Sequence, residues 1–133
     1  MHIPLAPIDI HPPFAPYSHG VEVPAGQRLV FCSGQLGIAA DGSVPHDCAG
    51  QARLCFDNIE AILREAGMGL EHIVRVNAYV SGREHLRPYM EVRNTLFSAP
   101  LPASTLMIVA GFARPEFVVE IEAIAAGPDA QRD

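Results

Sequence analysis

Two acidic side chains near the end of the chain are the first residues that could do chemistry. The stretch VVEIEAIA, residues 118–125, alternates as a β-strand does, so Glu120 and Glu122 lie on one face together with Val118 and Ile124. A carboxylate beside water costs nothing, whereas a covered carboxylate needs a donor, a proton or a ligand. The environment of this face therefore decides whether the two acids are functional.

The sequence lacks most other motifs of catalysis. Its six histidines show no HxH, HExxH or Cys-His pairing at ligand spacing, so no metal site is expected. GxSxG and GxGxxG are absent, which argues against a serine-hydrolase elbow and a dinucleotide site. The chain also has no lysine, and a Schiff base, a pyridoxal-phosphate site or a P-loop would need one. No cofactor is expected.

Composition predicts one soluble domain. A chain of 133 residues can bury roughly two thirds of its unfolded surface. The formal net charge of -6 disfavours nucleic acid as a partner, because binding to it rests on neutralising phosphates. The longest apolar run falls far short of the ~20 residues that a membrane span requires, so no membrane partner is expected.

The cysteines predict a reduced environment. There are three, an odd number, and they have no CxxC spacing. The first ten residues lack a basic start followed by an apolar run and a small-residue cleavage site, so a cytoplasmic location is expected. Cys32 and Cys55 fall within apolar stretches and are expected to be buried as small hydrophobic residues.

Hydrophobic periodicity predicts the element order β-β-α-β-α-β-β within one domain, residues 1–133. A proline-rich arm, residues 1–15, precedes it and a tail, residues 127–133, ends it. This order favours an α+β fold in which one mixed sheet carries two helices on one face. The last two strands are expected as a pair joined by GFARPE. The expected strands are 18–23, 28–33, 72–80, 103–110 and 117–125, and the expected helices are 47–67, capped by Asp47 and Gly67, and 83–97.

Two helices can cover only one face of such a sheet. Residues 29–32 and 106–109 are apolar on both faces, so another copy of the chain is expected to hide the second face. If Glu120 and Glu122 lie there, the two carboxylates sit ~7 Å apart in a partly dry interface, with repulsion on the order of 2 kcal/mol. They would then need donors, protons or ligands.

Four short segments resemble the signature segments of the Rid family, also called YjgF or L-PSP endoribonuclease. The resemblance spans about residues 14–126. It implies a chorismate-mutase-like α+β fold, a homotrimer with a small central barrel, and a ligand cleft at each subunit interface. The segments are PYSHG at 16–20, CSGQLG at 32–37, QARLCFDNIEAILREAG at 51–67 and VEIEAIA at 119–125.

The resemblance also implies an activity and site residues. Members of the family hydrolyse reactive enamines and imines, such as 2-iminopropanoate, to a 2-oxo acid and ammonia. Carried over to this chain, Tyr17 lines the cleft, the backbone at Gly34 contacts the ligand and Glu120 orients the attacking water. In the deaminases, an arginine after a Pro-Ala pair binds the substrate carboxylate as a bidentate fork.

This chain departs from the family at that arginine. It has Pro-Ala-Ser at 102–104, and the cysteine often found two places later is Leu106. Ser104 can donate one neutral hydrogen bond, so weak or absent activity on 2-iminopropanoate is expected. Arg114, in the turn before the last strand, or Arg28 of a neighbouring subunit are candidate replacements for the missing fork.

Two classes of function stay open. One is a Rid-type hydrolase or tautomerase that acts on an enamine, imine or related small unsaturated metabolite. The alternative is a non-catalytic trimer that binds or senses a small molecule. Glu120 is either the acid that acts on water or a structural carboxylate, whereas for Glu122 a structural role, with strand amides or Arg75 as donors, is favoured. Tyr17 either contacts the ligand or only packs the arm.

Overall fold

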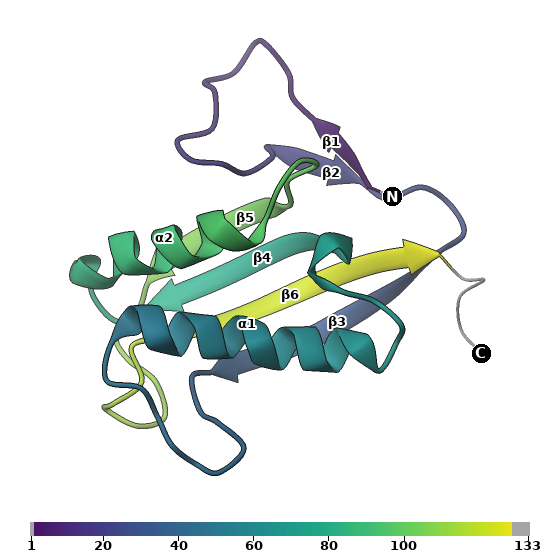
Figure 1. The fold of residues 1–133 in the computed structure, drawn as a ribbon. Coiled ribbons are helices and arrows are strands. Elements are labelled where there is room, and N and C mark those ends of the chain that lie inside the picture. Colours follow the sequence, from purple (N-terminus) through teal and green to yellow (C-terminus); the bar gives the residue numbers. More distant parts are fainter. Residues whose placement is uncertain (1, 129–133) are drawn as a thin grey trace.

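The computed structural model describes residues 2–128 and shows a mixed α+β fold (Figure 1). A four-stranded sheet has the strand order β3-β6-β4-β5, and a separate two-stranded sheet joins β1 to β2. The strands are β1 (Ile3–Leu5), β2 (Gly20–Glu22), β3 (Gln27–Leu36), β4 (Ile73–Val80), β5 (Ala103–Ile108) and β6 (Val119–Pro128), and the helices are α1 (Cys48–Arg64) and α2 (Leu86–Leu96).

The last strand lies inside the sheet. β6 pairs antiparallel with both β3 and β4, while β5 pairs parallel with β4 and forms an edge. The expectation that the last two strands form a pair was therefore wrong. Parallel neighbours need a crossover connection, and α2 supplies it between β4 and β5. The loop after β5 then carries the chain back across β4, so that β6 fills the gap beside β3.

Both helices pack on the same face of the sheet, as expected (Figure 1). Their apolar stripes meet the inward-facing side chains of β4 and β6 in one core. The largest fully buried side chains of that core include Phe56, Ile59, Leu63, Tyr89 and Ile121. The apolar residues that recur with the helix period of 3.6 and those that recur with the strand period of two thus lie in the same buried layer.

The predicted caps of the first helix are confirmed. The side chain of Asp47 accepts a hydrogen bond from the Gly50 amide at 3.1 Å. At the other end Gly67 has a φ of 72°, and the Met68 amide donates to the Leu63 carbonyl at 2.9 Å. This pattern is a Schellman-type closure, which glycine allows without strain.

The ends of the domain differ from the expectation. Residues 3–5 of the arm form β1, which pairs antiparallel with β2, and β2 is shorter than the predicted strand 18–23. Proline lacks an amide donor, so the proline-rich arm sustains only a short edge pairing. In the predicted tail, Gly127 and Pro128 belong to β6 and pair with β3; residues 129–133 lie outside the described part.

The second helix is also shorter than predicted. A 3₁₀ turn, Arg83–His85, precedes α2, which begins at Leu86. Pro88 is therefore the third residue of the α-helix. At that position the backbone amide has no acceptor within the helix, so the proline does not interrupt it.

All three cysteines, Cys32, Cys48 and Cys55, are buried and free, so the prediction for Cys32 and Cys55 is confirmed. Desolvation raises the pKa of Cys48 to about 11 and that of Cys55 to about 12. Both are neutral thiols at physiological pH, which suits small apolar core residues rather than nucleophiles.

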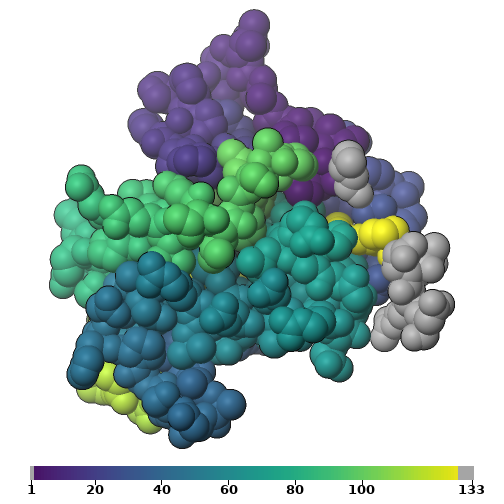
Figure 2. Space-filling model, viewed as in Figure 1, coloured from purple at the N-terminus to yellow at the C-terminus, as the bar shows by residue number. Residues whose placement is uncertain are grey.

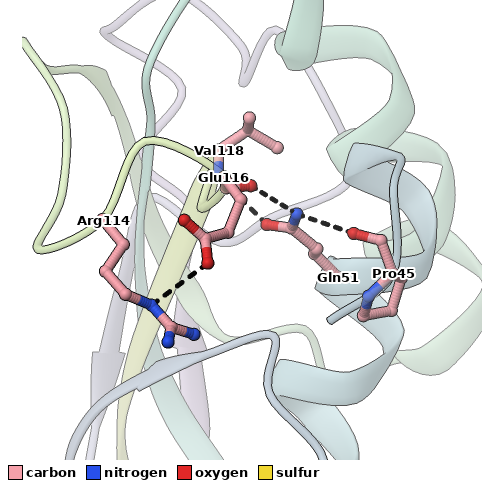
Figure 3. Close-up of polar contacts among 5 residues, drawn as sticks. All are labelled: Pro45, Gln51, Arg114, Glu116 and Val118. Carbon is pink, nitrogen blue, oxygen red and sulfur yellow. Dashed lines mark hydrogen bonds and ion pairs between the residues drawn. The ribbon is translucent and has the colours of Figure 1, made fainter. Parts of the chain in front are cut away.

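One buried amide ties α1 to the start of β6 (Figure 3). Gln51 is fully buried, and its Nε2 donates to the carbonyls of Pro45 and Glu116, both at 2.9 Å. Its Oε1 accepts from the Val118 amide at 3.0 Å. A Cβ at Gly37 would lie 2.6 Å from the Cα of Gln51, so the end of β3 approaches α1 closely only because this residue is glycine. Gln51 therefore anchors the segment that leads into the acidic strand.

We expect Gln51→Met to lower the free energy of unfolding by about 3 kcal/mol, because it leaves three backbone groups without their partner. Urea unfolding followed by circular dichroism measures this. The control is Arg53→Met, an exposed position on the same helix, which should change stability by less than about 0.5 kcal/mol. Equal costs at the two positions would contradict the anchoring role.

Candidate active site

The sheet has one open face, and both acids lie on it. Along β6, Val119, Ile121 and Ala123 are buried, whereas Glu120 and Glu122 are only half-buried and point away from the helices. Their cross-strand neighbours and the large apolar side chains of the edge strands share this face. These neighbours are Leu29, Phe31, Asn77, Tyr79, Met107 and Ile124.

This open face is apolar in the isolated chain. Phe31 is 70% exposed, Leu29 52% and Met107 50%. Side chains of this size are rarely grouped on the surface of a monomer unless the surface meets a partner. The prediction that the helices leave a second apolar face uncovered is therefore confirmed; what covers it stays a prediction.

Glu120 lies over the backbone of Gly34. The β3–β6 ladder shifts register between Cys32 and Gln35, which places Gly34 within a bulge. A Cβ added to Gly34 would overlap the carboxylate of Glu120, so only glycine leaves room for the acid at this point. The structure thus brings two of the candidate residues together: the Glu120 carboxylate and the half-buried backbone of Gly34.

Glu122 is held by neighbouring strands. Asn77 Nδ2 donates to its Oε2 at 3.0 Å. The pKa of Tyr79 is raised by desolvation and by the charge and hydrogen bond of Glu122. Arg75, the donor that the sequence suggested, instead donates to Thr105 Oγ1 at 2.9 Å. These contacts satisfy the Glu122 carboxylate and fit a structural role.

Both acids line a shallow pocket of about 270 Å³. It lies where β4 and β6 meet the loop that follows β5. Its walls combine two carboxylates and a phenol with an apolar rim, which suits a small polar ligand. The lining residues are Tyr79, Val109, Gly111, Phe112, Glu120 and Glu122.

Arg114 and Arg28 are engaged elsewhere. Arg114 Nε lies 3.2 Å from Glu116 Oε2 (Figure 3). Its guanidinium carbon also lies 4.7 Å from the centroid of the Phe117 ring. Arg28 donates to the carbonyl oxygens of Pro128 at 3.1 Å and Ala66 at 3.0 Å. These contacts place Arg114 beside the start of β6 and Arg28 at the ends of β6 and α1.

Ser104 and Leu106 lie on the opposite side of the sheet from Glu120. They alternate with Thr105 and Met107, which share the open face, so their side chains turn toward the helices. Ser104 Oγ accepts a hydrogen bond from Arg93 Nη1 at 3.3 Å, and Leu106 packs against the core.

Tyr17 lies at the β5 edge of the sheet. The next residue, Ser18, donates from its amide to the Pro102 carbonyl at 2.9 Å and from its Oγ to the Leu101 carbonyl at 2.6 Å. In Figure 2 the N-terminal arm, in purple, projects from the rest of the domain next to the green segment that leads into β5. Tyr17 Oη accepts from the Phe14 amide at 3.4 Å, and its ring meets His19 edge to face.

The candidate residues therefore form two groups. Gly34 and Glu120 lie together on β3 and β6, at one side of the sheet. Tyr17 and Ser104 lie at the β5 edge, on the other side. A single chain does not assemble them around one ligand.

The spacing of the candidate segments and this geometry match known proteins. The family model described as Endoribonuclease L-PSP matches residues 9–127. The chain belongs to the Rid family, also called YjgF. The RutC family protein YjgH of Escherichia coli K12 is 34% identical over 92% of this chain and 93% of its own.

Two further comparisons extend the match. TdcF of Escherichia coli K12, named as a candidate reactive intermediate deaminase, is 31% identical over 83% of this chain and 85% of its own. A crystal structure from Yersinia pestis, described as a Rid family protein of unknown function, superimposes with a TM-score of 0.81 at 27% identity. It covers 93% of this chain and 97% of that one.

Within residues 2–128, no three His, Cys, Asp or Glu side chains come together as a metal site. In the same part of the chain, every helix is too short or too polar to span a bilayer.

The sequence did not single out Arg93, Asn77 or Tyr79. Side chains alternate between the two faces of a strand, so Asn77 and Tyr79 lie on the same face of β4. Only the register between β4 and β6 places them opposite Glu122 and Glu120. Arg93 carried no motif, and only its burial marks it.

We expect Gly34→Ala to lower the free energy of unfolding by about 1 kcal/mol, because the new methyl group must displace the Glu120 carboxylate. The same substitution in a Glu120→Ala background should cost close to nothing, and urea unfolding of the four proteins in this cycle measures the difference.

The control for this cycle is Gly20→Ala, where an added Cβ meets Leu5 at an ordinary 3.7 Å. An equal cost of Gly34→Ala in both backgrounds would mean that Glu120 does not lie over Gly34.

Proposed function

We propose that the protein is a homotrimeric Rid-type hydrolase that acts on an enamine or imine of a small metabolite in a cleft between subunits. The observation that carries this proposal is the division of the candidate residues. Glu120 and Gly34 lie on an open apolar face, and Tyr17 and Ser104 lie at the far edge of the sheet. A neighbouring copy supplies the missing half of each site.

The apolar face supports self-association. Burying apolar surface yields roughly 25 cal/mol per Å², and Phe31, Leu29 and Met107 offer large side chains for it. In a cyclic trimer the two contacting surfaces differ, so the β5 edge of one subunit can meet the β3–β6 side of the next. That arrangement encloses Glu120 beside Tyr17 and Ser104 of another subunit.

The chemistry requires little from the protein. The carbon of a C=N group is already electrophilic, so water adds to it once the water is held and polarised. Glu120 accepts a hydrogen bond from that water and takes its proton as the carbon–oxygen bond forms. Returning that proton to nitrogen gives a carbinolamine. A second transfer, from the new hydroxyl group to nitrogen, breaks the carbon–nitrogen bond, so that ammonia leaves and a carbonyl forms. The overall change is imine plus water to ketone or 2-oxo acid plus ammonia.

The same acid can act as a tautomerase. In that reaction Glu120 moves a proton between the carbon and the nitrogen of an enamine, with no net change in atoms. Ser104 in place of the family's arginine lowers affinity for a small 2-imino acid, because a neutral hydroxyl replaces a bidentate cation. Slow hydrolysis of 2-iminopropanoate is therefore part of the proposal.

A non-catalytic binding trimer is the second candidate, and the neutral Ser104 is the observation that favours it. Such a protein would show a ligand-dependent rise in melting temperature with no product.

The test of turnover is the hydrolysis of 2-iminobutanoate, generated by an amino acid oxidase and trapped with semicarbazide. We expect the wild-type protein to shorten the lifetime of the imine and Glu120→Gln to lose at least about a hundredfold in rate, because general-base catalysis contributes on that scale. The matched control is Glu122→Gln, two residues along the same strand, which can still accept from Asn77 and should retain most activity.

Full activity of Glu120→Gln would remove Glu120 from the mechanism. No turnover of any imine, together with a raised melting temperature on adding small carboxylates, would support the binding trimer instead.

The assembly has its own test. We expect light scattering after gel filtration to give three times the chain mass of 14.3 kDa, and Phe31→Asp to give a folded monomer without activity. The control is Phe14→Asp, a phenylalanine of the arm that is 85% exposed against 70% for Phe31, and this variant should stay trimeric. If the wild-type protein is a monomer at micromolar concentration, the proposal of a site between subunits is wrong.

A further inference from the structure

Two pockets adjoin at the end of the sheet where β4 begins and β6 ends. The larger has a volume of about 380 Å³ and the smaller one of about 190 Å³, and both are lined by Glu71 and Pro100. In Figure 1 the start of the chain and the end of β6 lie at this end of the sheet. Sites for small molecules typically have about 300–1,000 Å³, so the larger pocket is within that range.

These pockets are separate from the candidate active site. Pro128, which lines the larger pocket, ends β6, whereas Glu120 lies near the start of the same strand. At ~3.4 Å per residue the two positions are about 27 Å apart along the strand. A small molecule bound here does not touch Glu120 of the same chain.

His2 places a buried acceptor in the wall of the larger pocket. It is 5% exposed, and its Nε2 lies 3.0 Å from the carbonyl oxygen of Pro100. A carbonyl oxygen only accepts, so Nε2 carries the hydrogen and Nδ1 of the neutral ring keeps a lone pair. Among residues 2–128 no donor reaches this Nδ1. An acceptor without a partner favours a ligand that brings an N–H or O–H group.

Glu71 supplies a negative charge where the two pockets meet. The neighbouring ring of His72 does not neutralise it. His72 Nδ1 accepts a hydrogen bond from the Gly69 amide at 3.0 Å, so the ring carries its hydrogen on Nε2 and is neutral. The distance of 3.8 Å between His72 Nδ1 and Glu71 Oε2 is therefore not an ion pair. No arginine lines either pocket, so the carboxylate charge is available to a ligand.

The end of α2 adds to this negative potential. Leu96 and Phe97, the last helical residue and the one after it, line the smaller pocket. Phe97 is extended, and in the described part of the chain no backbone amide closes this end as Met68 does in α1. The last carbonyl groups of a helix carry a partial negative charge, which favours a cation. Arg93 belongs to the same turn, but it donates to Asn94 and Ser104 and lines neither pocket.

We propose that the two adjoining pockets bind a small organic cation, a primary ammonium group with an apolar body. The ammonium group donates to the Glu71 carboxylate, beside the end of α2, and His2 Nδ1 offers a second acceptor. The apolar body lies in the larger pocket between Pro100 and Pro128. A metal ion fits less well, because within residues 2–128 no three His, Cys, Asp or Glu side chains come together. This site does not depend on the proposed hydrolysis of imines.

The test compares two probes of nearly equal shape, 2-phenylethylamine, which is a cation at neutral pH, and the uncharged 2-phenylethanol. Each is titrated into the untagged full chain, and amide chemical shifts are followed by nuclear magnetic resonance. We expect the amine to bind at least about fivefold more tightly, the scale of one charge-assisted hydrogen bond to a partly exposed carboxylate. The amides of Glu71, His72 and Phe97 should shift, and that of Gly34 should not.

Glu71→Gln should abolish the preference for the amine and leave binding of the alcohol unchanged. The matched control is Glu84→Gln. Glu84 lies in the other 3₁₀ turn, its carboxylate is 3.7 Å from the ring of His85, and its side chain is 75% exposed against 76% for Glu71. It lines neither pocket, so this variant should keep the preference.

Three results would overturn the inference: equal binding of the two probes by the wild-type protein, a preference for the amine that survives in Glu71→Gln, or shifts centred on Gly34 and Glu120. The first of these needs no variant at all. The proposed function fails by other results, when the wild-type protein hydrolyses no imine or when Glu120→Gln is fully active.

Discussion

The structure depends on one asymmetry: one face of the sheet is covered by the helices, and the other is left open. Both helices pack on one face and build a single core there. The other face carries the exposed aromatic and aliphatic side chains of the edge strands together with two carboxylates. Apolar surface of this kind favours association, and charged groups within it oppose association unless they gain donors or ligands. The acids are tolerable on that face because neighbouring strands and a glycine bulge accommodate them.

β6 is the strand through which these features are linked. Its central position gives Glu120 and Glu122 neighbours on both sides, Gly34 from β3 and Asn77 and Tyr79 from β4. Gln51, in the first turn of α1, makes three hydrogen bonds, two of them to Glu116 and Val118 just before β6. These bonds anchor the strand that carries the two acids to α1. The candidate acid therefore sits on the most constrained part of the sheet, which suits a group that must be positioned for chemistry.

Membership of the Rid family fits this architecture. Opposite charges lie on opposite sides of the sheet. The acids are on the open face, and the buried Arg93 of α2 donates to Ser104 on the helix-covered face.

The sequence by itself determined the elements and the placement of the acids on one face, because the two-residue and 3.6-residue periods and the caps at Asp47 and Gly67 are local signals. It also indicated the family through four ordered segments. The order of the strands, the pairing of β1 with β2 and the insertion of β6 between β3 and β4 were decided only by the tertiary structure, since cross-strand register depends on contacts between residues far apart in the chain. The same holds for Ser104 and Arg93. Which sheet face a residue of β5 takes, and which helix reaches it, follow from how α2 packs on the sheet, and no local pattern encodes that.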